Sequence, residues 1–316
     1  MFWKKCRKPA ALTSALLLAI CISGRAQTEK LAISRFQVLN DFYANPALFG
    51  HWSKPAFGLI YDGAIPEKDF ANNDLIGFYN QRLKGIGAGV ELHLTNEGPR
   101  QISSAKAGLS GGFDFYSKHR FSFGAALKYT YYYYDFGAVT FPDRIDPFYG
   151  FVRSIPSEPY FSSTSVVGVD VGISLQGPKY LFSVYGENAA PIFMQKNGQD
   201  AKYFSSDTYI HLPAILNGVF LYQVNLGKDF KLSPGAKVAY NFEAPDPWYS
   251  GLLNFQWRNI AMVNYSYESR GFHQIMVGGR IKDKVSLGIG ASTYHGIYSP
   301  FYTDRVIYRL SVLTQL

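Results

Sequence analysis

The feature that most constrains this chain is a strict alternation of apolar residues with small or polar ones, kept up over long segments. From Ile86 to Leu94 every second residue is apolar, and the residues between are glycine or polar. Similar segments start at Phe121, Ser165 and Lys284. Successive side chains of a strand point to opposite faces, so each segment has one apolar and one small or polar face. The alternation therefore predicts long, two-faced β-strands.

The length of these segments separates a membrane barrel from a soluble sandwich. A tilted membrane-spanning strand needs about 9–11 residues, whereas strands of soluble proteins average about 5–6. No stretch after residue 26 approaches 18 consecutive apolar residues, which excludes transmembrane helices. Charged residues are 17% of the chain, below the roughly 25% of a soluble domain, and aromatic residues are also 17%. Unpaired strand edges are costly in lipid, so the predicted fold is an all-β, closed antiparallel transmembrane β-barrel.

The connections between the predicted strands support a count of about 14. The expected strands cover residues 56–62, 74–82, 86–95, 102–116, 120–134, 164–176, 179–188, 209–224, 229–242, 248–258, 260–268, 272–282, 284–296 and 305–316. Long or Pro/Gly-rich connections alternate with short ones along this series. Outer-membrane barrels have long extracellular loops and short periplasmic turns, so both termini are expected in the periplasm.

The faces of one strand give an early mutational expectation. Val169 belongs to the apolar face of its segment and Gly172 to the opposite face. We expect Val169→Arg to be strongly destabilising, because its charge would enter lipid. Gly172→Ser is expected to be mild unless the lumen is tightly packed.

The N-terminus reads as an export signal. A basic start is followed by an apolar stretch over residues 10–22, and then by the small residues Gly24 and Ala26. Such a stretch is too short to span a bilayer, and this order is typical of a secretory signal peptide. We expect residues 1–26 to be a signal peptide, cleaved after Ala26, and residues 27–316 to form the outer-membrane protein.

Charge and cysteine content exclude several function classes. The chain has 31 basic and 23 acidic residues, but five of the basic residues and none of the acidic ones lie in the signal, so the mature charge is 26 − 23 = +3. This modest excess gives no reason to expect nucleic-acid binding. Cys6 and Cys21 are both in the signal. Disulfides, Cys-zinc sites and thiol catalysis are therefore excluded for the mature protein.

The sequence carries no recognisable active site. Nucleophile-elbow, zinc-protease, phosphate-binding and EF-hand motifs are absent, and the six histidines lack ligand spacing. We expect no enzyme activity, catalytic residue, cofactor or metal site. Ionisable residues of both signs are expected to point inward and to form a polar, hydrogen-bonded filling. They are Glu91, Lys106, Asp114, Lys128, Asp170, Lys237, Arg258 and Arg309.

The longest connection, residues 135–163, is the candidate binding surface. Loops of this length in compact domains are usually lids, plugs or binding surfaces. Its aromatic residues and scattered charges are typical of a protein-interaction patch. The candidate partner-binding residues are Phe141, Asp143, Asp146, Phe148, Tyr149 and Phe151. The alternative is that this loop folds inward and plugs the lumen.

Several motifs, taken in order, resemble one family. Residues 45–50 (NPALFG) look like the N-P-x-x-x-G box near the mature N-terminus of PorP/SprF-type membrane proteins of the type IX secretion system. Residues 85–89 with 96–99, 141–147 with 150–151, 232–234, and 265–267 with Gln274 and Gly278 resemble later patterns of that family. We place residues 27–55, which contain the box, in a periplasmic N-terminal segment.

The resemblance implies a Bacteroidota outer-membrane barrel that helps to export or anchor secreted proteins with a type IX C-terminal domain, including gliding adhesins. The implied partners are outer-membrane lipid, such a secreted protein and periplasmic components of the machinery. The family has no catalytic residues to carry over. The alternative function is a passive channel or hydrophobic-solute transporter.

Overall fold

The computed structural model describes residues 44–51, 54–64, 72–97, 100–116, 118–135, 145–146, 150–151, 161–197, 214–242, 246–258, 260–269, 272–281, 284–294 and 305–315. The predicted signal peptide lies outside these residues. No helix in the described ranges is long and apolar enough to cross a membrane.

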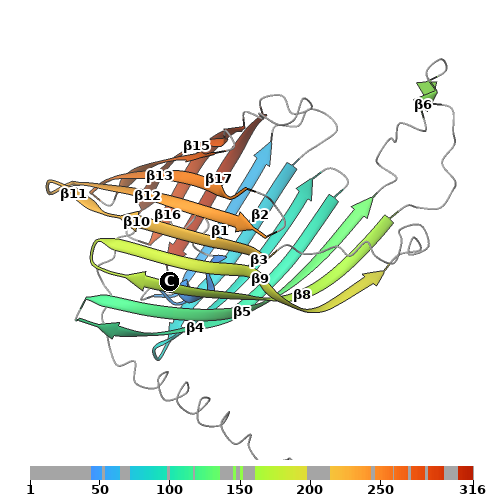
Figure 1. Cartoon of the computed structure of the whole chain (residues 1–316). Coiled ribbons are helices and arrows are strands. Elements are labelled where there is room, and N and C mark those ends of the chain that lie inside the picture. Colours follow the sequence, from blue (N-terminus) through green and yellow to red (C-terminus); the bar gives the residue numbers. More distant parts are fainter. Residues whose placement is uncertain are drawn as a thin grey trace, which may run out of the picture.

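The strands form one closed antiparallel barrel (Figure 1). The first half contains β1 (Ala56–Ala64), β2 (Asn72–Leu83), β3 (Ile86–Glu97), β4 (Arg100–Phe115), β5 (His119–Asp135), β8 (Phe161–Gln176) and β9 (Tyr180–Asn197). The second contains β10 (Ile215–Tyr222), β11 (Val224–Leu226), β12 (Phe230–Asn241), β13 (Trp248–Trp257), β14 (Ala261–Glu268), β15 (Phe272–Ile281), β16 (Val285–Tyr294) and β17 (Arg305–Gln315). β10 and β11 both pair with β12 and form one passage through the wall, so the barrel has fourteen strands, as predicted.

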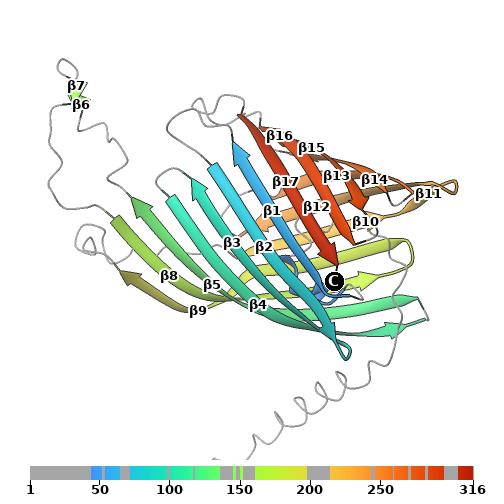
Figure 2. The same cartoon turned by 180° about the vertical axis from the view of Figure 1, so that it is seen from behind.

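The ends of the barrel differ in their connections (Figures 1 and 2). The turns after β2, β4, β8, β11, β13 and β15 are short and share one end, which we call the short-turn end. The other connections lie at the opposite end, which we call the long-loop end; those after β1, β5, β9 and β16 are the longest, whereas those after β3 and β14 are also short. β1 and β17 close the wall, and one of their register pairs joins Asp62 to Arg309. The Arg309 guanidinium donates to both Asp62 carboxylate oxygens at 2.6 Å, which ties the first strand to the last.

The predicted faces are confirmed. Large apolar side chains at outward positions are exposed all around the barrel, among them Leu92, Leu127, Ile173, Ile289 and Leu310. Exposed apolar residues over the whole circumference suit a wall that faces lipid. The alternating residues point inward, where Ser104, Thr130, Asp170, Ser174 and Ser311 are buried.

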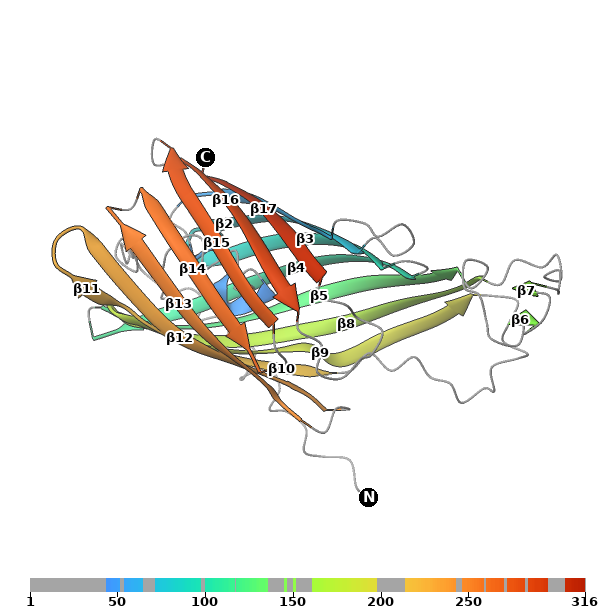
Figure 3. The same ribbon diagram turned by 90° about the horizontal axis from the view of Figure 1, so that it is seen from above.

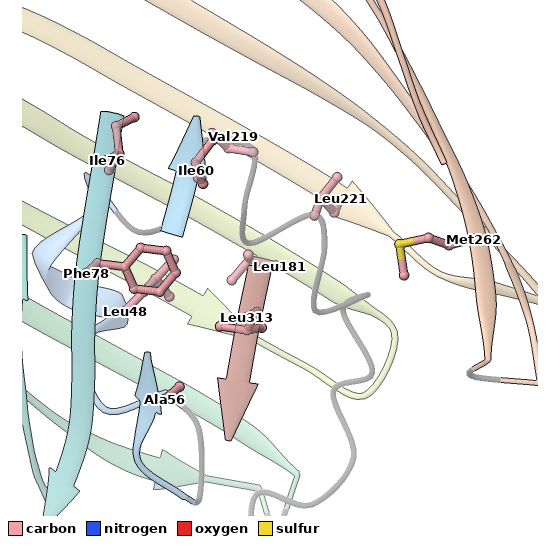
Figure 4. Packing of buried hydrophobic residues seen from close by; sticks show 10 residues of the cluster. All are labelled: Leu48, Ala56, Ile60, Ile76, Phe78, Leu181, Val219, Leu221, Met262 and Leu313. Atoms are coloured by element: carbon pink, nitrogen blue, oxygen red, sulfur yellow. The ribbon is translucent and has the colours of Figure 1, made fainter. Parts of the chain in front are cut away.

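The interior is not polar throughout, which differs from the predicted polar filling. Inward residues of β1, β2, β9, β10, β14 and β17 form an apolar cluster, joined by Leu48 from the N-terminal segment (Figure 4). The cluster consists of Leu48, Ala56, Ile60, Ile76, Phe78, Leu181, Val219, Leu221, Met262 and Leu313. The inner faces of β3, β4, β5 and β8 are charged or glycine-rich. A segment inside this barrel can therefore make both apolar and polar contacts.

Two predicted details are wrong at the level of single elements. β9 continues to Asn197, beyond the predicted end at residue 188, because a bulge rather than a loop follows Asn188. The pairing with β8 shifts around Asp170, and the Asp170 carboxylate accepts a hydrogen bond from the Asn188 N–H at 2.8 Å. Arg258 does not point inward, because β13 ends at Trp257 and Arg258 lies in the following turn with a φ of +48°.

Candidate functional site: the lumen and its plug

The N-P-x-x-x-G box lies inside the barrel. Pro46–Leu48 form a 3₁₀ helix, η2, which contacts β4, β5 and β8 (Figure 3). Our prediction of a periplasmic segment over residues 27–55 is therefore wrong for residues 44–51, because the lumen satisfies both their polar groups and their apolar side chains. Residues 27–43, 52 and 53 lie outside the described ranges. We call residues 44–51 the plug.

The residue types of the box account for its shape. The Asn45 side chain caps η2 by accepting a hydrogen bond from the Ala47 N–H at 2.8 Å. Pro46 begins the helix, where its missing N–H costs nothing. Gly50 has a φ of +65°, which glycine adopts without strain. The sequence thus specifies a short capped turn that starts and ends within six residues.

Polar side chains of four strands hold the plug. Asn45 donates to Ser183 Oγ, and the Gly50 N–H donates to the Asn80 side chain. On β4, Lys106 Nζ donates to the Ala44 carbonyl at 3.0 Å, and Ser110 Oγ donates to the Phe49 carbonyl at 2.6 Å.

Gln176, on β8, holds the last plug residue. Its Nε2 lies 2.9 Å from His51 Nδ1. Burial, together with the charges of Arg120 and Arg82, lowers the pKa of His51 to about 4, so a neutral imidazole can accept this bond near pH 7.

Inward-facing glycines form the cradle in which the plug lies. A Cβ atom at Gly87 would overlap the Phe49 backbone, and one at Gly89 would overlap the Phe49 ring. A Cβ at Gly124 would overlap the Pro46 backbone, and one at Gly172 would overlap the Asn45 side chain. Glycine at these four positions lets the plug lie directly against the wall. A pocket between the plug and the wall, lined by Phe49, His51 and Gln176 among others, has a volume of about 10 Å³, roughly the space of one water.

Leu48 anchors the plug in the apolar cluster. Leu48 is 7% exposed and belongs to the apolar cluster, where Figure 4 shows it beside Phe78 of β2. The plug is therefore held by polar contacts to β2, β4, β8 and β9 and by the apolar contact of Leu48. It fills part of the lumen at the short-turn end.

A buried ionic cluster lies beside the plug. Lys106 is 3% exposed, and its Nζ lies 2.8 Å from Glu91 and 3.7 Å from Asp170. Lys128 lies 3.6 Å from Glu187, whose other oxygen accepts from Asn217 at 3.3 Å. Five of the eight ionisable residues predicted to point inward, Glu91, Lys106, Lys128, Asp170 and Arg309, thus take part in ion pairs of the lumen.

A cavity of about 260 Å³ lies on the long-loop side of the plug. Its lining includes Ala44 of the plug, charged residues of both signs, and Lys237, which was also predicted to face inward. Asp114 lies near the short-turn end and pairs with Arg120 at 3.3 Å. In the described part of the chain, no group of three or more metal-ligating side chains comes together.

The predicted partner-binding residues are only partly described. Asp146 lies on β6 (Ile145–Asp146) and Phe151 on β7 (Gly150–Phe151), which pair only with each other. Phe141, Asp143, Phe148 and Tyr149 lie outside the described ranges. The plug seen in the structure comes from the N-terminal box, a role for which sequence reasoning had proposed only the 135–163 loop as a candidate.

Solved structures share the fold at low sequence identity. The toluene transporter TodX of P. putida is 11% identical with a TM-score of 0.52, and the alignment covers 87% of this chain and 94% of TodX. The monoaromatic hydrocarbon channel CymD is 11% identical with a TM-score of 0.51, covering 88% and 92% of the two chains. These likenesses show an outer-membrane barrel fold. No curated protein sequence matches the chain significantly.

The family model described as type IX secretion system membrane protein PorP/SprF matches residues 26–296. This span contains the plug and all strands from β1 to β16. The chain therefore belongs to the PorP/SprF family of type IX secretion system outer-membrane proteins, as its motifs predicted.

Proposed function

We propose that this protein is a plugged, non-enzymatic barrel that assists the export or surface anchoring of secreted proteins such as gliding adhesins. The observation that carries the proposal is the plug, which is hydrogen-bonded to four strands inside the lumen. A lumen partly filled by the chain's own N-terminal box is suited to a docking platform more than to an open channel. Family membership supplies the link to type IX secretion.

The proposed partner is a secreted protein with a type IX C-terminal domain, bound at the long-loop end through residues 135–163. Phe141, Phe148, Tyr149 and Phe151 would supply aromatic contacts, and Asp143 and Asp146 would supply acidic ones. Periplasmic components of the machinery would meet the opposite end. Export would depend on residues 1–26, removed after Ala26, which the mass of the mature protein would test.

The alternative function is a channel for hydrophobic solutes. TodX and CymD, whose folds this chain resembles, are described as a toluene transporter and a monoaromatic hydrocarbon channel. The cavity argues against this alternative, because Glu91, Lys106, Lys128, Glu187 and Lys237 line it. An apolar solute would displace water from these charged groups, which costs free energy. The charged lining therefore favours a docking barrel.

The experiment replaces residues 144–158 with a Gly/Ser linker of equal length. We expect an inserted, heat-modifiable barrel whose cognate cargo is lost from the cell surface, with ion conductance in planar bilayers unchanged. The control places the same linker over the fifteen residues 199–213, in the connection after β9. Unchanged cargo display together with a rise in conductance would assign the loop to closure of the lumen and contradict the proposal.

A further inference from the structure

Each of the six short turns carries a basic residue. In chain order these are Lys84, Lys118, Lys179, Lys228, Arg258 and Lys284. Arg82, Arg120, Lys231 and Arg280, on the adjoining strand ends, alternate with outward apolar residues and face the lumen instead. We call the six turn residues the basic rim. The turns join strand pairs distributed over the whole closed sheet, so the rim surrounds the short-turn end.

Few carboxylates offset this charge. In the described part of the same turns and strand ends, the acidic residues are Asp114 and Asp229. Asp114 pairs with Arg120 at 3.3 Å and Asp229 with Arg258 at 3.0 Å. The five rim lysines are all exposed, and none forms an ion pair within the described ranges. Positive charge therefore remains at this end after the local pairs are counted.

The rim lies at the border of the apolar outer band. Leu83 next to Lys84, Trp257 next to Arg258, and Ile281 close to Lys284 are each more than 40% exposed. The Arg258 guanidinium lies 5.6 Å from the centroid of the Trp257 ring. Lysine and arginine with aromatic neighbours are typical of the membrane interface, where stems and rings contact acyl chains and charged ends reach the headgroups.

The arrangement favours one kind of binding partner. A protein partner would select one side of the barrel end, whereas lipid headgroups contact its full circumference. Basic clusters beside an apolar membrane surface attract anionic lipids. We propose that the basic rim binds the phosphates of anionic phospholipid headgroups around the short-turn end. This inference does not depend on the proposed role in export.

The test compares the purified full-length barrel in detergent with its quintuple lysine variants. Native mass spectrometry would measure retention of phosphatidylglycerol against phosphatidylcholine. We expect wild type to prefer phosphatidylglycerol, and the preference to fall with added salt. The variant with Lys84, Lys118, Lys179, Lys228 and Lys284 all changed to Gln should lose most of it, by up to about fivefold per lysine at low salt.

The matched control changes the same five lysines to Arg, which keeps the charge and should keep the preference. A wild-type barrel that retains both lipids equally would overturn the proposal. So would a Gln variant with unchanged lipid retention. If that variant instead lost a crosslinked periplasmic protein in cells, the rim would belong to a protein interface.

Discussion

At the scale of single residues, the lumen is organised by buried charged groups whose partners all lie within the protein. Lys106 contacts Glu91, Asp170 and the Ala44 carbonyl while almost fully buried. Removing one member of such a cluster leaves buried charge without compensation, and this is costlier than loss of the attraction alone.

We therefore expect Lys106→Met to destabilise the protein by about 3–5 kcal/mol. The measurement is the urea midpoint of barrels folded into vesicles. Lys128→Met is the matched control, because Lys128 and Glu187 are less deeply buried, with side chains 18% and 25% exposed. The control should lose clearly less stability. Similar losses in both variants would show that burial of the Lys106 cluster does not set the cost.

The contact of Gly172 with Asn45 changes our expectation for Gly172→Ser. From the sequence this change was expected to be mild, but the serine Cβ would overlap the Asn45 side chain. We now expect Gly172→Ser to loosen the plug while the barrel still folds. Bilayer conductance and heat-modifiable gel mobility, measured together, would show this. A non-conducting Gly172→Ser barrel would argue that the plug shifts without leaving its cradle.

Val169→Arg, on the outer face, should instead cost the barrel roughly 2–4 kcal/mol of stability if it lies near the bilayer midplane.

At the scale of elements, strands were predictable and the plug was not. The alternation of apolar with small or polar residues along β3, β5, β8 and β16 is enough, by itself, to predict these strands from the sequence. β9 departs from it where Ala189, Ala190 and Pro191 interrupt the alternation, and the extension beyond Asn188 depends on the Asp170 carboxylate of another strand.

The plug has no period, because it is a single capped turn. Asn45, Pro46 and Gly50 specify its shape, but its position depends on Gly87, Gly89, Gly124 and Gly172, which come from three other strands. Each of these glycines was visible as part of a small or polar face. Only the barrel registers bring them to one level, so local sequence could not reveal the cradle.

The plug should be separable from the barrel. Deleting residues 27–51 leaves all fourteen wall strands, so we expect an inserted, heat-modifiable protein. Its conductance in planar bilayers should rise well above wild type, since the turn that fills part of the short-turn end is gone. Asn45→Ala is the milder companion and should give intermittent openings, because it removes both the cap and the bond to Ser183. A deletion that stays closed would show that another segment seals the lumen.

At the scale of the whole molecule, the two ends of the barrel are chemically different. The short-turn end carries the basic rim and the plug, and the long-loop end carries the predicted partner loop and the mouth of the charged cavity. Residues 27–316 carry a net charge of only +3, so the excess at one end implies a compensating excess of acidic residues elsewhere. The difference in charge between the short-turn end and the long-loop end favours one orientation of the barrel in the membrane.

The orientation itself is the last prediction. Residues 27–316 contain no cysteine, so single cysteines placed there would be read without background if residues 1–26 are removed as predicted. Substitutions at Asn72, Ser157 and Asn197 should react with an impermeant thiol reagent on intact cells, because they lie in or beside long connections. Substitutions at Lys118 and Lys228 should react only after the outer membrane is opened, because short turns face the periplasm. Labelling of the Lys118→Cys variant on intact cells would reverse the topology. The basic rim would then face the outer leaflet, while the closed wall and the seated plug would stand unchanged.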